Sequence, residues 1–172
     1  MLFSEAIGRT VVSTDTASTV GKISDYVVDP RLPGVVALIL SKTSSQGSAL
    51  PWPNIVAFGV DAVTVPSAAA VVEPDPYLAE LAGRPHTLLH KRVLTTSGVQ
   101  LGTVLDVDFD PAVGRLAALL LEQGPIDAAR LLGVGSYAVI VSVTVSSSDE
   151  GPNLATNPLR WRHLRDVRTA WI

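Results

Sequence analysis

The sequence repeats itself once, and this internal repeat limits the possible fold more than any other feature. Three blocks recur in the same order: residues 21–30 with 102–111, 34–40 with 114–120, and 55–65 with 131–141. Eleven of the 28 aligned positions are identical, whereas composition alone would give roughly two. A repeat of this length predicts one supersecondary unit that was duplicated, so we expect the same fold twice along the chain.

The repeated blocks have the character of strands joined by turns. Val35 to Leu40 and Tyr137 to Val145 are short aliphatic or β-branched runs bounded by Gly, Pro and Asp, which favours strands over helices. Segments 29–34 and 110–114 are predicted hairpin turns, in which the aspartate accepts backbone hydrogen bonds and the final glycine takes a positive φ. Short strands separated by turns predict two small β-barrels or sandwiches, so the fold class is mainly β.

The segment between the repeats predicts a linker with one short helix. Residues 66–85 mix alanine, proline and acidic residues. Asp75 can cap a helix over Tyr77 to Ala82, Pro76 suits its first position, and Gly83 suits its exit.

The C-terminal segment predicts a basic amphipathic helix. Asn157 can cap it and Pro158 can occupy its first position. Residues 157–172 carry four arginines against one aspartate, whereas the whole chain has a net charge of −3. The predicted organisation is therefore a first barrel at 1–72, a linker with a short helix at 73–86, a second barrel at 87–147, and a polar linker with the basic helix at 148–172.

Composition excludes several kinds of chemistry. The chain has no cysteine, which removes disulfides, thiol nucleophiles and thiolate metal sites. Its longest apolar runs are far shorter than the ~20 residues that a transmembrane helix needs. The first residues lack the basic and apolar regions of a secretory signal, so we expect a cytoplasmic protein.

The repeated motif resembles the PRC-barrel domain, named for the cytoplasmic domain of the photosynthetic reaction-centre H subunit. Each half carries Gly-x-[Ile/Val]-x-Asp, then Asp-Pro, a short turn ending in Gly, an apolar strand, and a late Gly-x-x-Ala-Val segment. Leu50-Pro51-Trp52 is similar to the family's Leu-Pro-Trp element, but the second half has Ile126-Asp127-Ala128 there. The resemblance implies two tandem PRC-type β-barrels of about six strands each, with no catalytic centre and a role in docking to other proteins. The H subunit and the ribosome maturation factor, which has a similar domain, both act by docking.

Three groups of residues invite a catalytic or metal interpretation, and we favour a structural one for each. Asp106, Asp108 and Asp110 offer oxygen ligands, but the loop after them has the wrong residues for a helix-loop-helix calcium site. His86 and His90 are four residues apart, a metal-ligand spacing only on a helix, and Pro85 precedes them. The run 133–137 contains two glycines and a serine but matches neither a phosphate loop nor a nucleophile elbow. We therefore expect no catalytic residue, metal or cofactor.

Partner binding is the function that the sequence favours. Trp52 stands between two prolines, where it could either anchor a partner or be buried across the barrel mouth. The C-terminal candidates are Trp161, Arg162, Arg165, Arg168 and Trp171. The helix that carries them could instead pack on the acidic barrels.

We expect a non-enzymatic adaptor that binds a protein partner on barrel rims, outer strands or the groove between the halves. One alternative is a factor in ribosome assembly or RNA metabolism, with nucleic acid contacted only through the basic helix. Another is an accessory protein at a membrane surface. An exposed barrel edge could also pair two copies as a homodimer.

Overall fold

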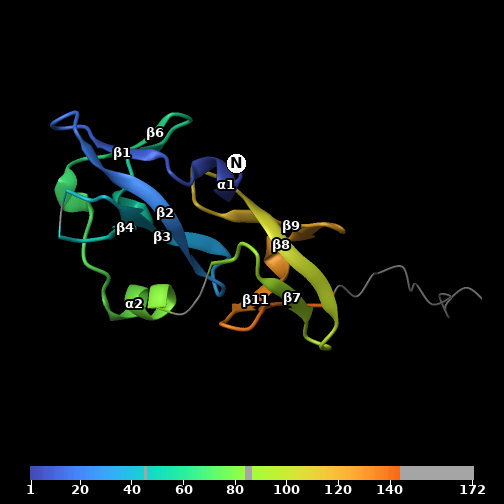
Figure 1. Ribbon diagram of the computed structural model, residues 1–172. Helices are drawn as coiled ribbons and strands as arrows, with labels where there is room; N and C mark the ends of the chain where they lie inside the picture. The colour runs from blue at the N-terminus through green and yellow to red at the C-terminus, as the bar shows by residue number, and fades with distance from the viewer. Residues whose placement is uncertain (45, 84–86, 144–172) are drawn as a thin grey trace, which may run out of the picture.

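The fold is mainly β and contains two β-barrel-like units of six strands each, as the repeat predicts (Figure 1). The computed structural model describes residues 1–44, 46–83 and 87–143. The first unit and the linker contain α1 (Phe3–Ala6), β1 (Thr10–Ser13), β2 (Thr19–Asp29), β3 (Gly34–Ser41), β4 (Ala49–Pro51), η1 (Trp52–Asn54), β5 (Ala57–Phe58), β6 (Ala62–Val65), η2 (Ala68–Ala70) and α2 (Pro76–Gly83). The second contains β7 (Arg92–Thr95), β8 (Gln100–Phe109), β9 (Leu116–Leu121), β10 (Gly124–Asp127), η3 (Ala128–Arg130), β11 (Leu131–Val134) and β12 (Val139–Val141).

The two sheets have the same strand order. The first runs β4-β3-β2-β1-β6-β5 and the second runs β10-β9-β8-β7-β12-β11. In both, one pair of strands is parallel, β1 with β6 and β7 with β12, and every other pair is antiparallel. Each strand of the first unit therefore has a counterpart six places later, which is the structural form of the sequence repeat.

The aspartate that the two copies of the motif share stabilises a bulge in each unit. The register between β2 and β3 shifts before Asp25, and the register between β8 and β9 shifts before Asp106. At each bulge the aspartate Oδ1 accepts a hydrogen bond, of 2.8 Å, from the next backbone N–H, that of Tyr26 or Val107. An irregular ladder leaves backbone donors to be satisfied by other groups, and a short carboxylate does so here.

The strand ladders correct one part of the repeat alignment by a single residue. Leu38 on β3 pairs with Tyr26, and the counterpart of Tyr26, Val107, pairs with Leu119 on β9. Leu38 therefore corresponds to Leu119, not to Ala118 as the sequence identities indicated. Both leucines are fully buried, which agrees with the corrected register.

The correction follows from different uses of glycine in the two turns. Gly114 takes the predicted positive φ, of 73°, but Gly34 is not among the residues with positive φ. In the corrected register Gly34 corresponds to Arg115, so Gly34 and Gly114 are not equivalent positions of the repeat. The predicted aspartate contacts are confirmed, since Asp29 accepts from Arg31 N at 2.9 Å and Asp110 accepts from Ala112 N at 2.8 Å.

The linker helix forms where the sequence predicts it. Asp75 caps α2 by accepting a hydrogen bond of 2.7 Å from Leu78 N. Leu78 is buried with Val27 and Ala37, so α2 covers the outer side of β2 and β3. The last predicted strand is too long at both ends. Tyr137 lies in a bend, and Ala138, Ser142 and Val143 lie outside β12, while Thr144 and Val145 lie outside the described residues.

The two units share a hydrophobic core through aromatic side chains. Phe3 stacks on Tyr26 with ring centroids 3.7 Å apart. Phe109 of the second unit meets both rings edge-on, at 5.3 and 5.8 Å, and lies 5.6 Å from Phe58. Only 1% of Phe109 is exposed. One side chain of the second unit is therefore buried among aromatic residues of the first.

We expect Phe109→Ala to lower the free energy of unfolding by about 3–5 kcal/mol, because it leaves a cavity among the rings of Phe3, Tyr26 and Phe58. Urea unfolding followed by circular dichroism measures the change. Leu105→Ala on the same strand is the control, since Leu105 is exposed and its truncation should cost little. Equal losses from the two substitutions would contradict a core shared through Phe109.

Candidate functional site

The tips of two hairpins join the units by backbone hydrogen bonds. Val35 N donates to Gly114 O at 2.8 Å, and Leu116 N donates to Pro33 O at 3.0 Å. In the corrected register Val35 corresponds to Leu116 and Pro33 to Gly114. The two hydrogen bonds are therefore equivalent, and a pseudo-twofold axis passes between the hairpins.

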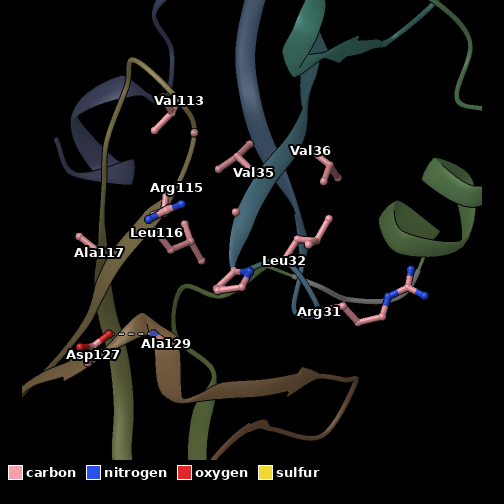
Figure 2. A pocket seen from close by; sticks show the side chains of 13 residues that line it. Arg31, Leu32, Val35, Val36, Val113, Arg115, Leu116, Ala117, Asp127 and Ala129 are labelled. Atoms are coloured by element: carbon pink, nitrogen blue, oxygen red, sulfur yellow. Dashed lines mark hydrogen bonds between the residues drawn. The ribbon is translucent and has the colours of Figure 1, made fainter.

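An open groove of about 650 Å³ lies beside this junction (Figure 2). It is lined by Arg31, Leu32, Pro33, Gly34, Val35, Val36, Val113, Gly114, Arg115, Leu116, Ala117, Asp127 and Ala129. Most of these residues are apolar, and they come from both units. The groove exists only because segments about 80 residues apart in sequence meet at the junction.

Exposed apolar side chains stand at the edge of the groove. Leu32 from the first hairpin is 71% exposed, and Val113 from the second is 62% exposed. Turns normally carry polar residues at such positions. Asp127 and Ala129 form another wall, where Asp127 Oδ1 accepts a hydrogen bond of 2.8 Å from Ala129 N and caps η3 (Figure 2).

Arg31 on the rim is held by a small polar cluster. Its Nε lies 3.2 Å from Asp29 Oδ1, and its Nη2 donates to the Tyr77 hydroxyl at 2.9 Å. The Tyr77 hydroxyl in turn donates to Asp29 Oδ2, so the cluster ties the first hairpin to α2. Burial by itself raises the pKa of Asp29, but the hydrogen bonds from Tyr77 and Arg31 outweigh it and hold the pKa below its usual value.

Trp52 lies against the second unit, half-buried between it and the rest of the first. Its ring stacks on Phe58 at 5.6 Å and meets Phe109 edge-on at 6.3 Å. It also covers Gly114, where a Cβ atom would come within 2.7 Å of the indole. Trp52 therefore contributes to the contact between the units, and its use as a partner-binding residue stays a prediction.

The family model of the PRC-barrel domain matches residues 1–72 and 83–150. The chain belongs to the PRC-barrel family. The two matches agree with the resemblance of the repeated motif and with the duplicated strand order. A search of curated proteins finds no match to the chain. The exact domain limits given above stay predictions.

The aspartate row of the second PRC-barrel unit is engaged in contacts with α1 and the residues before it. Asp106 accepts hydrogen bonds from the backbone and hydroxyl of Ser4, and Asp108 lies 2.8 Å from the amino group of Met1. Asp110 belongs to the hairpin turn. Within the described residues, no group of three or more histidine or carboxylate side chains lies where it could hold a metal ion.

The remaining sequence candidates are placed only in part. His90 has a positive φ of 62°, at the place that Gly8 occupies in the first unit, and His86 lies outside the described residues. Residues 133–137 form the end of β11 and the turn to β12. Trp161, Arg162, Arg165, Arg168 and Trp171 lie outside the described residues. In the part of the chain that the structure describes, no helix has the length and apolar character to cross a membrane.

The sequence predicts binding at a groove between the halves, but none of the residues that line this groove was predicted as a binding residue. Two residues in the sequence could have indicated the groove, the large apolar side chains Leu32 and Val113 at turn positions. They were assigned only to hairpin turns. The sequence does not indicate that Arg115 and Asp127 line the same groove, because this depends on how the two units pack against each other.

We expect Asp29→Asn to destabilise the protein at neutral pH and to change how its free energy of unfolding depends on pH in the acidic range. The pKa of Asp29 in the folded protein lies below its pKa in the unfolded chain, which is about 3.9. The stability that ionised Asp29 contributes is therefore fully present above the unfolded pKa, and it is lost as the pH falls through the folded pKa. The difference in unfolding free energy between wild type and variant should narrow below about pH 4, as measured by urea unfolding. Asp61→Asn, which makes the same charge change at an exposed residue, is the control and should cost little stability at neutral pH. A constant difference for Asp29→Asn would contradict the assignment.

We expect Gly114→Ala to destabilise the protein more than Gly98→Ala. Both glycines have a positive φ, 73° and 80°, so both substitutions incur backbone strain. Only the Cβ at Gly114 would meet another side chain, that of Trp52, which adds about 1–3 kcal/mol for overpacking. Thermal and urea unfolding measure the difference. In a Trp52→Ala background the two substitutions should cost the same, and a persistent difference would show that Trp52 is not the obstacle.

Proposed function

We propose that this protein is a non-enzymatic adaptor that binds a protein partner at the groove between its two PRC-barrel units. The observation that carries the proposal is the position of Leu32 and Val113, two large apolar side chains that stand exposed beside an apolar groove. Apolar surface of this kind is stabilised when a partner removes it from water, and contiguous patches of it commonly mark interaction sites.

The contacts that join the two walls of the groove support the same proposal. Its two walls are joined by the hydrogen bonds between the hairpins, and the core behind them contains Phe109. A surface that is already ordered loses little conformational entropy when a partner binds. The charged residues on the rim, Arg31, Arg115 and Asp127, supply the polar border that interfaces usually have.

The test is affinity capture from a native lysate with the full chain and two double variants. Leu32→Asp with Val113→Asp places charges beside the groove. Val60→Asp with Val99→Asp also replaces two exposed apolar side chains by aspartate, at turn residues that do not line the groove. We expect proteins retained by wild type and by the control pair to be depleted at least tenfold with the groove pair. Retention of the same proteins by all three, or of none by wild type, would contradict the proposal; circular dichroism confirms that each variant folds.

A further inference from the structure

The apolar side chains at the groove are arranged in pairs about the pseudo-twofold axis. In the corrected register the axis relates Leu32 to Val113 and Val35 to Leu116, because each pair occupies equivalent places in the two hairpins. Leu32 and Val113 therefore stand exposed on opposite sides of the axis, whereas Val35 and Leu116 line the groove. Protruding side chains and a recess thus belong to the same face of the molecule.

A face that carries both a recess and protruding side chains can fit a second copy of itself. In an isologous dimer both copies use the same patch, so the patch has to be self-complementary. When two of these faces meet, Leu32 and Val113 of each copy can lie beside those of the other and over the apolar walls of its groove. Four side chains that are mostly exposed in the single chain are then removed from water.

The charged side chains of the rim restrict the partner more than the apolar ones do. Arg115 and Asp127 both lie on the side of the second unit, and both are exposed (Figure 2). Among the described residues, the Arg115 guanidinium has no hydrogen bond or ion pair, and the Asp127 carboxylate accepts only the hydrogen bond from Ala129 N. Arg31, on the side of the first unit, is already paired with Asp29.

An occupant that covers this rim therefore has to offer both an acidic and a basic group. A charge that loses water without gaining a partner lowers the affinity, so a purely acidic ligand leaves Asp127 unpaired and a purely basic one leaves Arg115 unpaired. A second copy of the chain meets the requirement by symmetry. In an isologous contact each pairing occurs twice, so one contact forms two pairs of Arg115 with Asp127.

We propose that the groove binds a second copy of this chain in an isologous dimer, in which Arg115 of each copy pairs with Asp127 of the other. Leu32 and Val113 of both copies are buried between them. This inference rests on the proposed function, since it takes the groove as a binding surface, and it names the partner. Guanidinium and carboxylate have matching geometry, so the two pairs also fix the orientation of one copy on the other.

Sedimentation equilibrium of the full chain measures the dimer directly. We expect a concentration-dependent equilibrium of monomer and dimer for wild type, and a dissociation constant at least about tenfold higher for Leu32→Asp with Val113→Asp. Val60→Asp with Val99→Asp is the matched control and should dimerise like wild type, because these exposed valines do not line the groove. A wild-type chain that stays monomeric from micromolar to millimolar concentration, or a groove pair that dimerises like wild type, would overturn the inference.

Charge reversal tests the two proposed ion pairs. Arg115→Asp and Asp127→Arg each place like charges together in both pairs, so each variant should be monomeric where wild type is a dimer. An equal mixture of the two variants should form a heterodimer, because the acids of one then face the arginines of the other. The double variant should also dimerise, and Lys22→Asp, a reversal outside the groove, should leave the dimer intact. Monomers in both the mixture and the double variant would overturn the inference.

Asp127 also caps η3, so a further variant separates the charge from the cap. Asp127→Asn retains a side chain that can cap the helix and removes the charge. It should fold like wild type, as checked by circular dichroism, and raise the dissociation constant of the dimer several-fold. A native fold with an unchanged dissociation constant would contradict the proposed pairs.

Failure of the dimer is distinguishable from failure of the adaptor function. A monomeric wild type whose captured lysate proteins still depend on Leu32 and Val113 would refute the second copy as the partner and retain the adaptor function. A dimer that dissociates in the Leu32 and Val113 pair, while the same lysate proteins are retained by all three chains, would support the dimer and refute the binding of those proteins at the groove.

Discussion

The burial of Phe109 among aromatic side chains of the other unit is the contact on which the rest of the structure depends. Phe109 ends β8, and its ring is packed against Phe3, Tyr26, Trp52 and Phe58 of the first unit. A side chain of this size contributes a large apolar area to the core, and close packing fixes its position. Because Phe109 comes just before the second hairpin, its burial brings that hairpin against the first. The backbone hydrogen bonds between the tips then set the walls of the groove.

The duplicated units use the same backbone devices but different side chains at the junction. Both have an aspartate at the bulge, an aspartate that orders the hairpin turn, and one parallel strand pair. These devices satisfy local hydrogen bonds, so they recur wherever the same backbone recurs. Leu50 and Ile126 pair with the equivalent residues Leu38 and Leu119, so Trp52 corresponds to Ala128. The indole of Trp52 covers Gly114 of the other unit, whereas Ala128 is a fully buried core residue. Binding surfaces arise on a fold through such local differences, and the fold by itself does not specify them.

Much of the fold could be predicted from the sequence, and the errors have definite causes. The strand-rich units, the aspartate turns and the helix capped by Asp75 depend on residues close together in the chain, and they are confirmed. The alignment of Gly34 with Gly114 was wrong because identity does not distinguish a glycine needed for positive φ from one that is not. The strand over β12 was placed to start at Tyr137 because an apolar run does not show where the ladder begins. Trp52 could not be assigned to burial or exposure, since its neighbours Phe109 and Gly114 belong to the other unit.

The sequence by itself determined that this chain folds as a tandem repeat of PRC-barrel units with a short capped helix between them. Those features follow from local propensity, from hydrogen bonds between near neighbours, and from a pattern that occurs twice. Only the tertiary structure decided that the two units share a core, that their hairpins exchange hydrogen bonds, and that an apolar groove lies beside this junction. The physical reason is the distance along the chain. Contacts between side chains about 80 residues apart depend on packing against surfaces that neither half displays in its own sequence.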